Sequence, residues 1–383
     1  MKKLLIPALL GTSLLAGQAD EKKPTLAGKH LSLKLESQQV IQKGNKFLLS
    51  QQNKDGYWGD PNLPAISGFV VKCLLDDPAY DPKNPSPAIE KGLTWILAQQ
   101  KEDGGIYGRG MATYSTSSCI MALWAAGPEK YREQLVKARN FLINHQTDWG
   151  VKGEDDTKFD GGIGYGGSVA HSDLSNTHRA LEALYTTRTL ATDSGDKKAM
   201  ELDWEAALAF VSRCQNLQAT NKLEKVGNDG SFVYYPGNSK AGEVVDSKTG
   251  RVALRGYGSM SYSGLLSLVY ADLDESDQRV KAVIKWLSDN YTLEENPGLG
   301  GQGLYYYYNA MAKSLIAANK PTLNGKNGLE IDWRGDLAAA VINNQREDGS
   351  WINTIAARWM ENDPVLVTSY AVMTLEKIHS SLN

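Results

Sequence analysis

The chain has 383 residues, 41 basic and 44 acidic side chains and a formal net charge of -3. A mildly acidic protein of this kind offers no basic stripe to a phosphate backbone, so we exclude nucleic acid as a partner. Its three cysteines, Cys73, Cys119 and Cys214, lie in apolar contexts and are too few for a disulfide framework. We expect them to be small buried apolar groups.

The chain begins with the pattern of a bacterial-type signal peptide, residues 1–19. Two lysines precede an apolar run over residues 4–15, and small residues lead up to Ala19, after which we predict cleavage. This pattern predicts export to the periplasm or the medium. The apolar run is too short to span a membrane, and no later segment reaches the roughly 18 apolar residues of a transmembrane helix. Residues 20–37 are expected to form a flexible lead-in, and residues 38–383 one folded domain.

A repeated signal runs through the rest of the chain. In residues 52–58, 100–107 and 345–351, a glutamine that ends a helical run is followed three residues later by Asp-Gly and then by an aromatic residue. Weaker copies begin at Gln146, Gln215 and Asn290. Six copies predict six supersecondary units, each of them a pair of helices.

Both helices of a unit have recognisable features. The first has apolar residues at helical spacing, and the Asp-Gly pair ends it because glycine adopts backbone angles that other residues avoid. The second carries a hydroxyl residue six positions before a pair of small and apolar residues. This hydroxyl position holds Ser67, Thr116, Thr177, Ser261 and Thr368, and the fifth unit departs from it with Tyr308. The connections 148–167 and 218–256 are long, polar and glycine-rich, and we expect them to rim a central cavity.

The glutamine, Asp-Gly and tryptophan signature resembles the QW repeat of squalene-hopene cyclases, oxidosqualene cyclases and the β subunits of protein prenyltransferases. The resemblance extends from about Ile41 to His379. It implies an all-α fold, an α/α toroid (α6/α6 barrel) of about six helical-hairpin repeats. In such a toroid the first helices form an outer ring and the second helices an inner ring.

The resemblance does not extend to the acid of the class II terpene cyclases. Those enzymes protonate an alkene or epoxide with the middle aspartate of an Asp-x-Asp-Asp-Thr motif. The matching segment here is Asp173-Leu174-Ser175-Asn176-Thr177, and Ser175 stands in the place of the acid. A serine hydroxyl cannot protonate an alkene. A second acidic run, residues 272–275, follows its inner helix and is expected to be a solvated turn.

The zinc site of the prenyltransferases is also missing from the sequence. Its aspartate, cysteine and histidine would fall near Gly258, Met260 and Tyr307, none of which can serve as a zinc ligand there. We therefore expect no metal and no cofactor.

One polar cluster remains at the predicted start of the third inner helix, where His171, Asp173 and His178 follow one another. Asp173 and His178 are candidate catalytic residues, as an acid and base pair. His171 is a candidate ligand-binding residue, and a metal held by all three side chains is a weaker alternative. The plainer interpretation is that Asp173 caps the helix and the histidines are polar residues of the rim.

Tyrosines gather at the predicted starts of the inner helices, and the chain has 18 tyrosines against 6 phenylalanines. An aromatic cavity with a polar lining suits isoprenoids, sugars or peptides, although core packing explains some of these rings equally well. Besides His171, the candidate ligand-binding residues are Tyr114, Tyr262, Tyr305, Tyr307, Tyr308, Asn309 and Tyr370.

Three functions fit these observations. The first, favoured by the missing acid and zinc residues, is a toroid that binds a small molecule or a glycan in its central cavity. The second is a divergent enzyme acting on an isoprenoid through a site rebuilt around Asp173 and His178, and the third is a polysaccharide-active enzyme. A deep apolar cavity ringed by tyrosines would favour an isoprenoid, whereas an open groove with exposed tryptophan and paired carboxylates would favour a glycan. No oligomeric state follows from the sequence.

Overall fold

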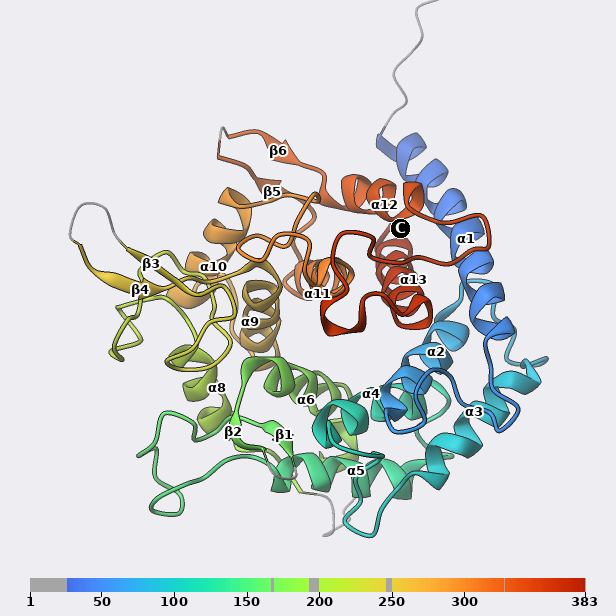
Figure 1. Cartoon of the computed structure of the whole chain (residues 1–383), viewed down its shortest axis with the longest axis horizontal. Coiled ribbons are helices and arrows are strands. Elements are labelled where there is room, and N and C mark those ends of the chain that lie inside the picture. The colour runs from blue at the N-terminus through green and yellow to red at the C-terminus, as the bar shows by residue number, and fades with distance from the viewer. Residues whose placement is uncertain (1–25, 167–168, 193–199, 246–249, 327, 383) are drawn as a thin grey trace, which may run out of the picture.

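Two concentric rings of helices make up the computed structural model, which describes residues 26–166, 169–192, 200–245, 250–326 and 328–382 (Figure 1). The outer ring consists of α1 (Leu26–Ser50), α3 (Pro87–Ala98), α5 (Arg132–Asn144), α8 (Trp204–Arg213), α10 (Gln278–Asp289) and α12 (Trp333–Asn343). The inner ring consists of α2 (Pro64–Asp76), α4 (Ala112–Ala125), α6 (Leu174–Thr186), α9 (Gly258–Tyr270), α11 (Leu304–Ala317) and α13 (Pro364–Ser381). Two short helices, α7 (Thr189–Thr192) and the 3-10 helix η1 (Arg358–Met360), lie in connections.

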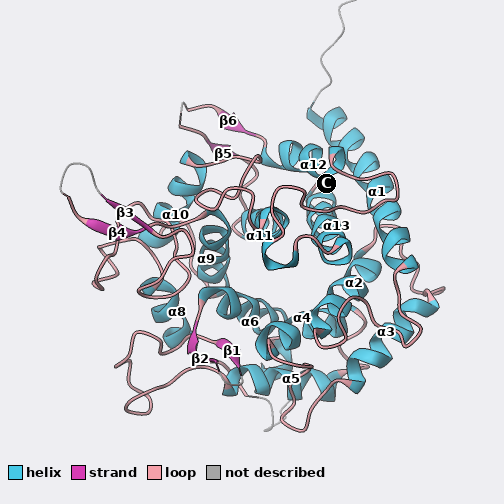
Figure 2. Cartoon of the chain, viewed as in Figure 1, coloured by secondary structure: helices cyan, strands magenta, loops and turns pink. Residues whose placement is uncertain are grey.

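The strands of the described residues pair into three antiparallel hairpins. They are β1 (Gly164–Gly166) with β2 (Val169–Ser172), β3 (Glu243–Val245) with β4 (Val252–Leu254), and β5 (Leu323–Asn324) with β6 (Glu330–Ile331). Figure 2 shows them in the connections between helices rather than in either ring. The predicted all-α toroid is thus confirmed.

The rings close because the last repeat packs on the first. Each inner helix contacts the next, and α13 contacts both α11 and α2 (Figure 1). In the outer ring, α12 contacts α1 in the same way.

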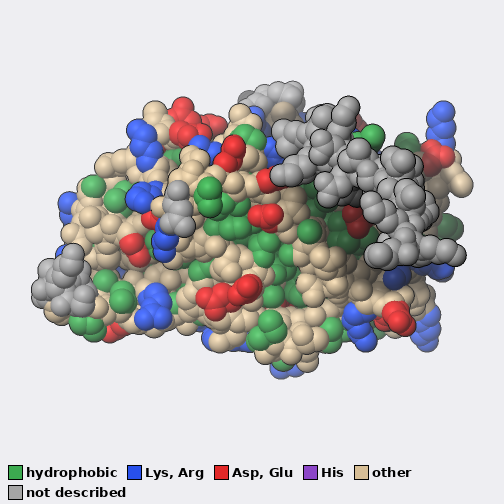
Figure 3. Space-filling model, turned by 90° about the horizontal axis from the view of Figure 1, so that it is seen from above, with side chains coloured by type: hydrophobic (Ala, Val, Ile, Leu, Met, Phe, Trp, Pro, Cys, Tyr) green, Lys and Arg blue, Asp and Glu red, His purple; other side chains and the backbone are tan. Residues whose placement is uncertain are grey.

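The N-terminal part of the toroid differs from the expectation. Helix α1 begins at Leu26, so residues 26–37 are helical rather than a flexible lead-in. Residues 1–19, the predicted export signal, lie outside the described residues, as do residues 20–25. Among the described helices, none has both the length and the apolar composition needed to cross a bilayer. Basic and acidic side chains are interspersed over the described surface seen in Figure 3.

The repeated glutamines connect neighbouring units at the turn that follows each outer helix, which we call the corner of the unit. The Gln100 side-chain amide donates to Gly104 O of its own turn at 2.9 Å and to Gln134 O at the start of the next outer helix at 3.0 Å. Four other glutamines make the same pair of bonds, namely Gln52, Gln146, Gln215 and Gln345. The last of these reaches Val40 O in α1 at 3.0 Å and so joins the sixth unit to the first. Asn290 departs from the pattern, because its amide donates to Trp286 O within its own helix.

The glycine of each Asp-Gly pair is required by the same corner. Gly104 has φ 90°, and a Cβ there would lie 2.4 Å from Lys137 O of the next outer helix. Only glycine combines that backbone angle with so close an approach.

The repeated hydroxyl residues fix the inner helices to these corners. The Thr116 hydroxyl accepts a hydrogen bond from the Ile106 backbone N–H at 2.9 Å. The equivalent bond, at 2.9 to 3.0 Å, is made by Ser67, Thr177, Ser261 and Thr368. The hydroxyl position therefore sets the rotation of five of the six inner helices, and with it the side chains that these helices turn toward the lumen.

Candidate ligand cavity of the inner ring

A cavity of about 370 Å³ lies inside one end of the inner ring. Each of the six inner helices contributes the residue two positions before its hydroxyl position, or before Tyr308 in the fifth unit. These lining residues are Ala65, Tyr114, Ser175, Ser259, Tyr306 and Leu366. The connections add Tyr165, Tyr234, Lys240, Tyr257, Trp359, Met360 and Glu361. As expected, the long connections 148–167 and 218–256 both contribute to its wall.

Five of the six tyrosines that line the cavity have a hydroxyl partner within the wall. The Tyr114 and Tyr370 hydroxyl oxygens lie 2.5 Å apart, and those of Tyr165 and Tyr234 lie 2.9 Å apart. The Tyr306 hydroxyl lies 3.3 Å from the Ser263 hydroxyl. Because the hydroxyls pair with one another, the surface offered to a ligand consists largely of rings and aliphatic groups.

A buried cation lies behind this aromatic wall. Arg179, one helical turn after Ser175 on α6, is 5% exposed. Its guanidinium lies over the rings of Phe69, Tyr114 and Tyr306 at 5.2, 4.9 and 5.5 Å from their centroids. Its Nη2 also donates to the Tyr114 hydroxyl at 3.2 Å. The aromatic faces of this part of the wall are thus occupied by a permanent positive charge.

A buried ion pair continues the polar cluster along the lumen beyond Arg179. Lys313 of α11 and Glu182 of α6 approach within 2.8 Å, and both side chains are less than 10% exposed. Burial alone would raise the pKa of Glu182, but Lys313 and Arg179 outweigh it and hold that pKa at about 2. Glu182 is therefore ionised throughout the physiological range.

Asp173 is the buried N-cap of α6 and does not line the cavity. Its carboxylate accepts hydrogen bonds from the backbone N–H and the side-chain amide of Asn176, both at 2.9 Å. Burial raises the pKa of Asp173 to about 6, and the bonds from Asn176 limit the rise. The capping interpretation agrees with this geometry.

The two candidate histidines lie in different surroundings, and neither lines the cavity. His178 is buried in α6, where burial and the charge of Arg179 lower its pKa to about 3, so its imidazole is neutral at physiological pH. His171 packs between the rings of Phe159 and Tyr235, at 5.8 and 4.6 Å. Among the described residues, no group of three His, Cys, Asp or Glu side chains is placed to hold a metal ion.

The predicted ligand-binding residues other than His171 divide into two groups. Tyr114 and Tyr370 line the cavity. The others are buried side chains outside its lining, namely Tyr262, Tyr305, Tyr307, Tyr308 and Asn309. Two of them hold the preceding loop, since the Tyr307 and Tyr308 hydroxyls donate to Thr292 O and Leu293 O.

Comparisons with known proteins agree with this architecture. The squalene-hopene cyclase C-terminal domain family matches residues 60–204. The apo structure of the type II terpene cyclase MstE from Scytonema has a TM-score of 0.51 and 14% identity, covering 91% of this chain and 99% of that one. A variant of the same enzyme in complex with its substrate, geranylgeranyl dihydroxybenzoate, has a TM-score of 0.51 and 13% identity over 91% and 99% of the two chains.

The chain is squalene cyclase-like over residues 60–204 and has a terpenoid cyclase-like fold. The fold is not confined to that chemistry, because a family 76 glycoside hydrolase from a bovine Bacteroides thetaiotaomicron strain also matches. Its TM-score is 0.51 at 13% identity, over 88% of this chain and 77% of that one. No curated protein sequence matches the chain. At such low identities the comparisons establish the fold, and the site has to be argued from its own residues.

In this squalene cyclase-like chain, the position of the cyclase acid does face the cavity. Ser175 lines it, and the hydroxyl there brings no acid. At the positions laid against the prenyltransferase zinc ligands, Met260 lines the same cavity and Gly258 begins α9. The squalene cyclase-like frame is thus present without either set of reactive groups.

Several lining residues were absent from the sequence-based candidates. They are Tyr165, Tyr234, Tyr257 and Tyr306, with Arg179 behind them. The repeat pattern could have identified Tyr306, because the residue two positions before the repeated hydroxyl position, or before Tyr308 in the fifth unit, faces the lumen in every unit. The loop tyrosines have no such periodic signal.

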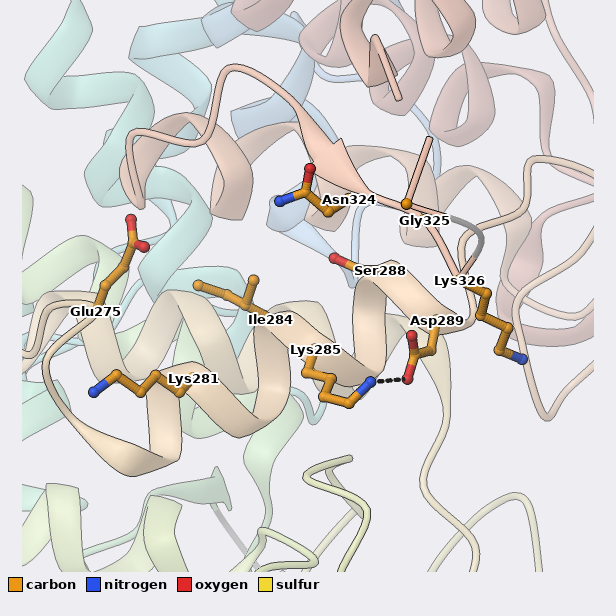
Figure 4. A pocket seen from close by; sticks show the side chains of 10 residues that line it. Glu275, Lys281, Ile284, Lys285, Ser288, Asp289, Asn324, Gly325 and Lys326 are labelled. Carbon is orange, nitrogen blue, oxygen red and sulfur yellow. Dashed lines mark hydrogen bonds and ion pairs between the residues drawn. The ribbon is translucent and has the colours of Figure 1, made fainter. Parts of the chain in front are cut away.

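A second hollow lies on the outside of the squalene cyclase-like toroid, between α10 and the β5–β6 hairpin (Figure 4). It has a volume of about 460 Å³ and is lined mainly by polar and charged side chains. Two of these, Lys285 and Asp289, pair with each other at 2.7 Å. Ile284 is the one large apolar side chain of this hollow, whereas the lumen has a wall of aromatic and aliphatic groups, so the lumen remains the better candidate site.

The raised pKa of Asp173 predicts a pH dependence of folding. A carboxyl whose pKa is about 6 in the folded protein and near 4 when unfolded binds its proton more tightly in the fold. The free energy of unfolding should therefore fall as pH rises from about 4 to about 6. Asp173→Asn keeps a capping side chain and should remove on the order of 2 kcal/mol of that fall. Urea denaturation of both proteins across this range measures it, with the exposed cap variant Asp332→Asn as control. Parallel curves for wild type and Asp173→Asn would show that the carboxyl does not titrate there.

Proposed function

We propose that the chain binds an apolar small molecule in the cavity of its inner ring and carries out neither cyclase nor prenyltransferase chemistry. The observation that carries this proposal is that five of the six lining tyrosine hydroxyls are paired within the wall, which leaves mainly rings and aliphatic side chains facing the cavity. Such a lining contributes to binding through buried apolar area. From the pattern of residues 1–19 alone, we further propose that the protein is exported.

Two features of the wall argue against a carbocation intermediate. Ser175 stands where the cyclases have their acid, so no strong proton donor is present at that position. The rings of Phe69, Tyr114 and Tyr306, which could stabilise a developing cation, already face the guanidinium of Arg179. A second positive charge there would be repelled by the first.

The lining also disfavours a glycan. Among the described lining residues the one carboxylate belongs to Glu361, and both of its oxygens are engaged. Oε1 accepts from Tyr306 N at 2.8 Å and Oε2 from the Asn353 amide at 2.6 Å. Glycosidases use a pair of free carboxylates, and sugars need polar partners for many hydroxyls. A site rebuilt from Asp173 and His178 has no better support, because neither side chain lines the cavity.

Filling the cavity should abolish binding. Ser175→Phe places a ring in the lumen, and we expect the affinity for the uncharged probe N-phenyl-1-naphthylamine to fall at least about tenfold, which is about 1.4 kcal/mol. Fluorescence titration measures it. Ser50→Phe, the same change at the exposed end of α1, should bind the probe as wild type does.

The identity of the natural ligand is open to direct measurement. Native mass spectrometry of protein from its own host should show an apolar molecule that is lost in Ser175→Phe. If neither this molecule nor the probe binds wild type, or if Ser175→Phe binds both unchanged, the proposed function is wrong.

A further inference from the structure

Two tyrosine hydroxyls and one guanidinium meet on the wall of the cavity. The hydroxyl oxygens of Tyr114 on α4 and Tyr370 on α13 are 2.5 Å apart, and Arg179 on α6 donates to Tyr114 at 3.2 Å. Both tyrosines line the cavity, while Arg179 lies behind them. Burial raises the pKa of Tyr370 well above its ordinary value, so this hydroxyl keeps its proton.

The two tyrosine hydroxyls have one more proton to donate than their described partners accept. Each hydroxyl has one proton to donate, and the bond between the two oxygens uses one of them. Arg179 only donates, so it accepts neither. Among the described residues, neither hydroxyl has any further hydrogen-bond partner. One O–H group of this partly buried pair therefore has no acceptor among the described residues, and a donor without an acceptor is unfavourable away from water.

The charge around this pair favours an anionic acceptor. Arg179 and Lys313 are both cations and Glu182 is the anion between them, so the three side chains carry a charge of 2 − 1 = +1. The Nε of Arg179 has no hydrogen-bond partner among the described residues. The carboxylates nearer the cavity are already engaged, Asp173 by Asn176 and Glu361 by the start of α11. A positive charge next to the Tyr114 hydroxyl also polarises its O–H bond toward donation.

We propose that the ligand is an amphiphile with a carboxylate head, which accepts the remaining proton of the Tyr114 and Tyr370 pair beside Arg179, while its apolar chain lies against the aliphatic lining. This inference rests on the proposed function and specifies the chemical class of the ligand. Met260 and Leu366 belong to the aliphatic part of that lining. Lys240 at the wall offers a competing cation, since its Nζ lies 4.3 Å over the ring of Tyr234.

The test compares three ligands that share a twelve-carbon chain, namely dodecanoate, dodecan-1-ol and dodecane, by displacement of N-phenyl-1-naphthylamine at about pH 7, where the carboxylate is ionised. Wild type should bind dodecanoate at least about tenfold more tightly than the other two. Each single variant, Tyr114→Phe or Tyr370→Phe, leaves one free O–H group and should keep a preference for the acid. The double variant removes both O–H groups while keeping the rings, so it should still bind the probe and should bind all three ligands alike.

Two control variants locate the head group. Tyr165→Phe changes the other hydroxyl pair and should keep the preference for dodecanoate, and so should Lys240→Gln. A preference lost in Lys240→Gln but kept in the double variant would place the carboxylate elsewhere and overturn the inference. Equal binding of all three ligands to wild type would also overturn it, yet leave the proposed function standing. Failure of every ligand and the probe to bind would overturn both.

Discussion

Replacing Lys313 with methionine should destabilise the protein by about 3 to 5 kcal/mol, because it leaves the Glu182 carboxylate buried without its partner. The two groups approach within 2.8 Å in a lumen where both are less than 10% exposed. Methionine has a similar length and fills the space, so the loss is one of charge rather than of packing. Urea denaturation at neutral pH measures the effect, and Lys137→Met, which breaks the exposed pair with Glu133, should change stability by less than about 1 kcal/mol.

The pH dependence of that variant distinguishes a buried charge from a packing defect. In wild type the pKa of Glu182 is depressed to about 2, so its contribution to stability is present above the unfolded value of 4.5 and is lost as pH falls toward 2. Without Lys313 the carboxylate loses its main stabilising charge, and its pKa in the folded protein rises. The deficit of Lys313→Met should therefore be largest above about pH 5 and shrink in acid. A deficit that is independent of pH would indicate a packing defect.

Replacing both Glu182 and Lys313 should destabilise the protein less than replacing Lys313 alone. Burial lowers the pKa of Lys313 to about 8 even though Glu182 lies beside it, so desolvation of the ammonium outweighs the attraction. Glu182→Leu combined with Lys313→Met should accordingly recover most of the stability that Lys313→Met loses.

The fold could be predicted because the repeated residues contact the backbone of the neighbouring unit in the same way. A glutamine that reaches the next outer helix, and a glycine that lets two units approach, impose the same constraint at every corner. Asn290 shows how far a repeat can depart from this, since its shorter amide reaches only its own helix. The N-terminal limit was wrong because α1 continues to Leu26 without any corner signal to mark its start.

The residues around the cavity were harder to predict from the sequence than the fold. Ser175, Arg179 and Glu182 recur at the spacing of one helix face, so their common direction is visible in the sequence. Their partners are not, because Lys313 is 131 residues from Glu182 and Tyr370 is 256 residues from Tyr114. Of the four consecutive tyrosines at 305–308, the sequence-based candidates are Tyr305, Tyr307 and Tyr308, whereas the helix turns the remaining one, Tyr306, into the cavity.

The loop that completes the cavity shows a further limit of sequence reasoning. Trp359 and Met360 both adopt left-handed backbone angles, φ 58° and 64°, although neither is glycine. The Trp359 ring closes over Gly303, where a Cβ would lie 3.0 Å from it, and the loop then brings Glu361 to the start of α11. Contacts between two repeats, rather than local preference, hold this conformation.

Trp351→Ala should destabilise the protein by about 3 to 5 kcal/mol, since it removes a fully buried ring at the place where the toroid closes. The indole fills the space beside Gly44 of α1, where a Cβ would lie 2.9 Å from it, and its Nε1 donates to Val341 O at 2.7 Å. Alanine would leave a cavity between the first and last repeats and a carbonyl without its donor. Urea denaturation measures the loss of stability.

Hydrogen exchange shows whether the loss of the Trp351 side chain opens the closed ring of helices. In Trp351→Ala the amides of α1, α12 and α13 should exchange faster, because these helices form the closure. Trp58→Ala is the matched control, since this equally buried indole packs against Gly92 of α3 and should cost a similar amount. Because its Nε1 donates to Leu48 O of α1, its faster exchange should instead appear in α2, α3 and the end of α1, and leave α12 and α13 unchanged. If both variants accelerated exchange uniformly, the toroid would unfold as one cooperative unit, and closure would not be a separately openable junction.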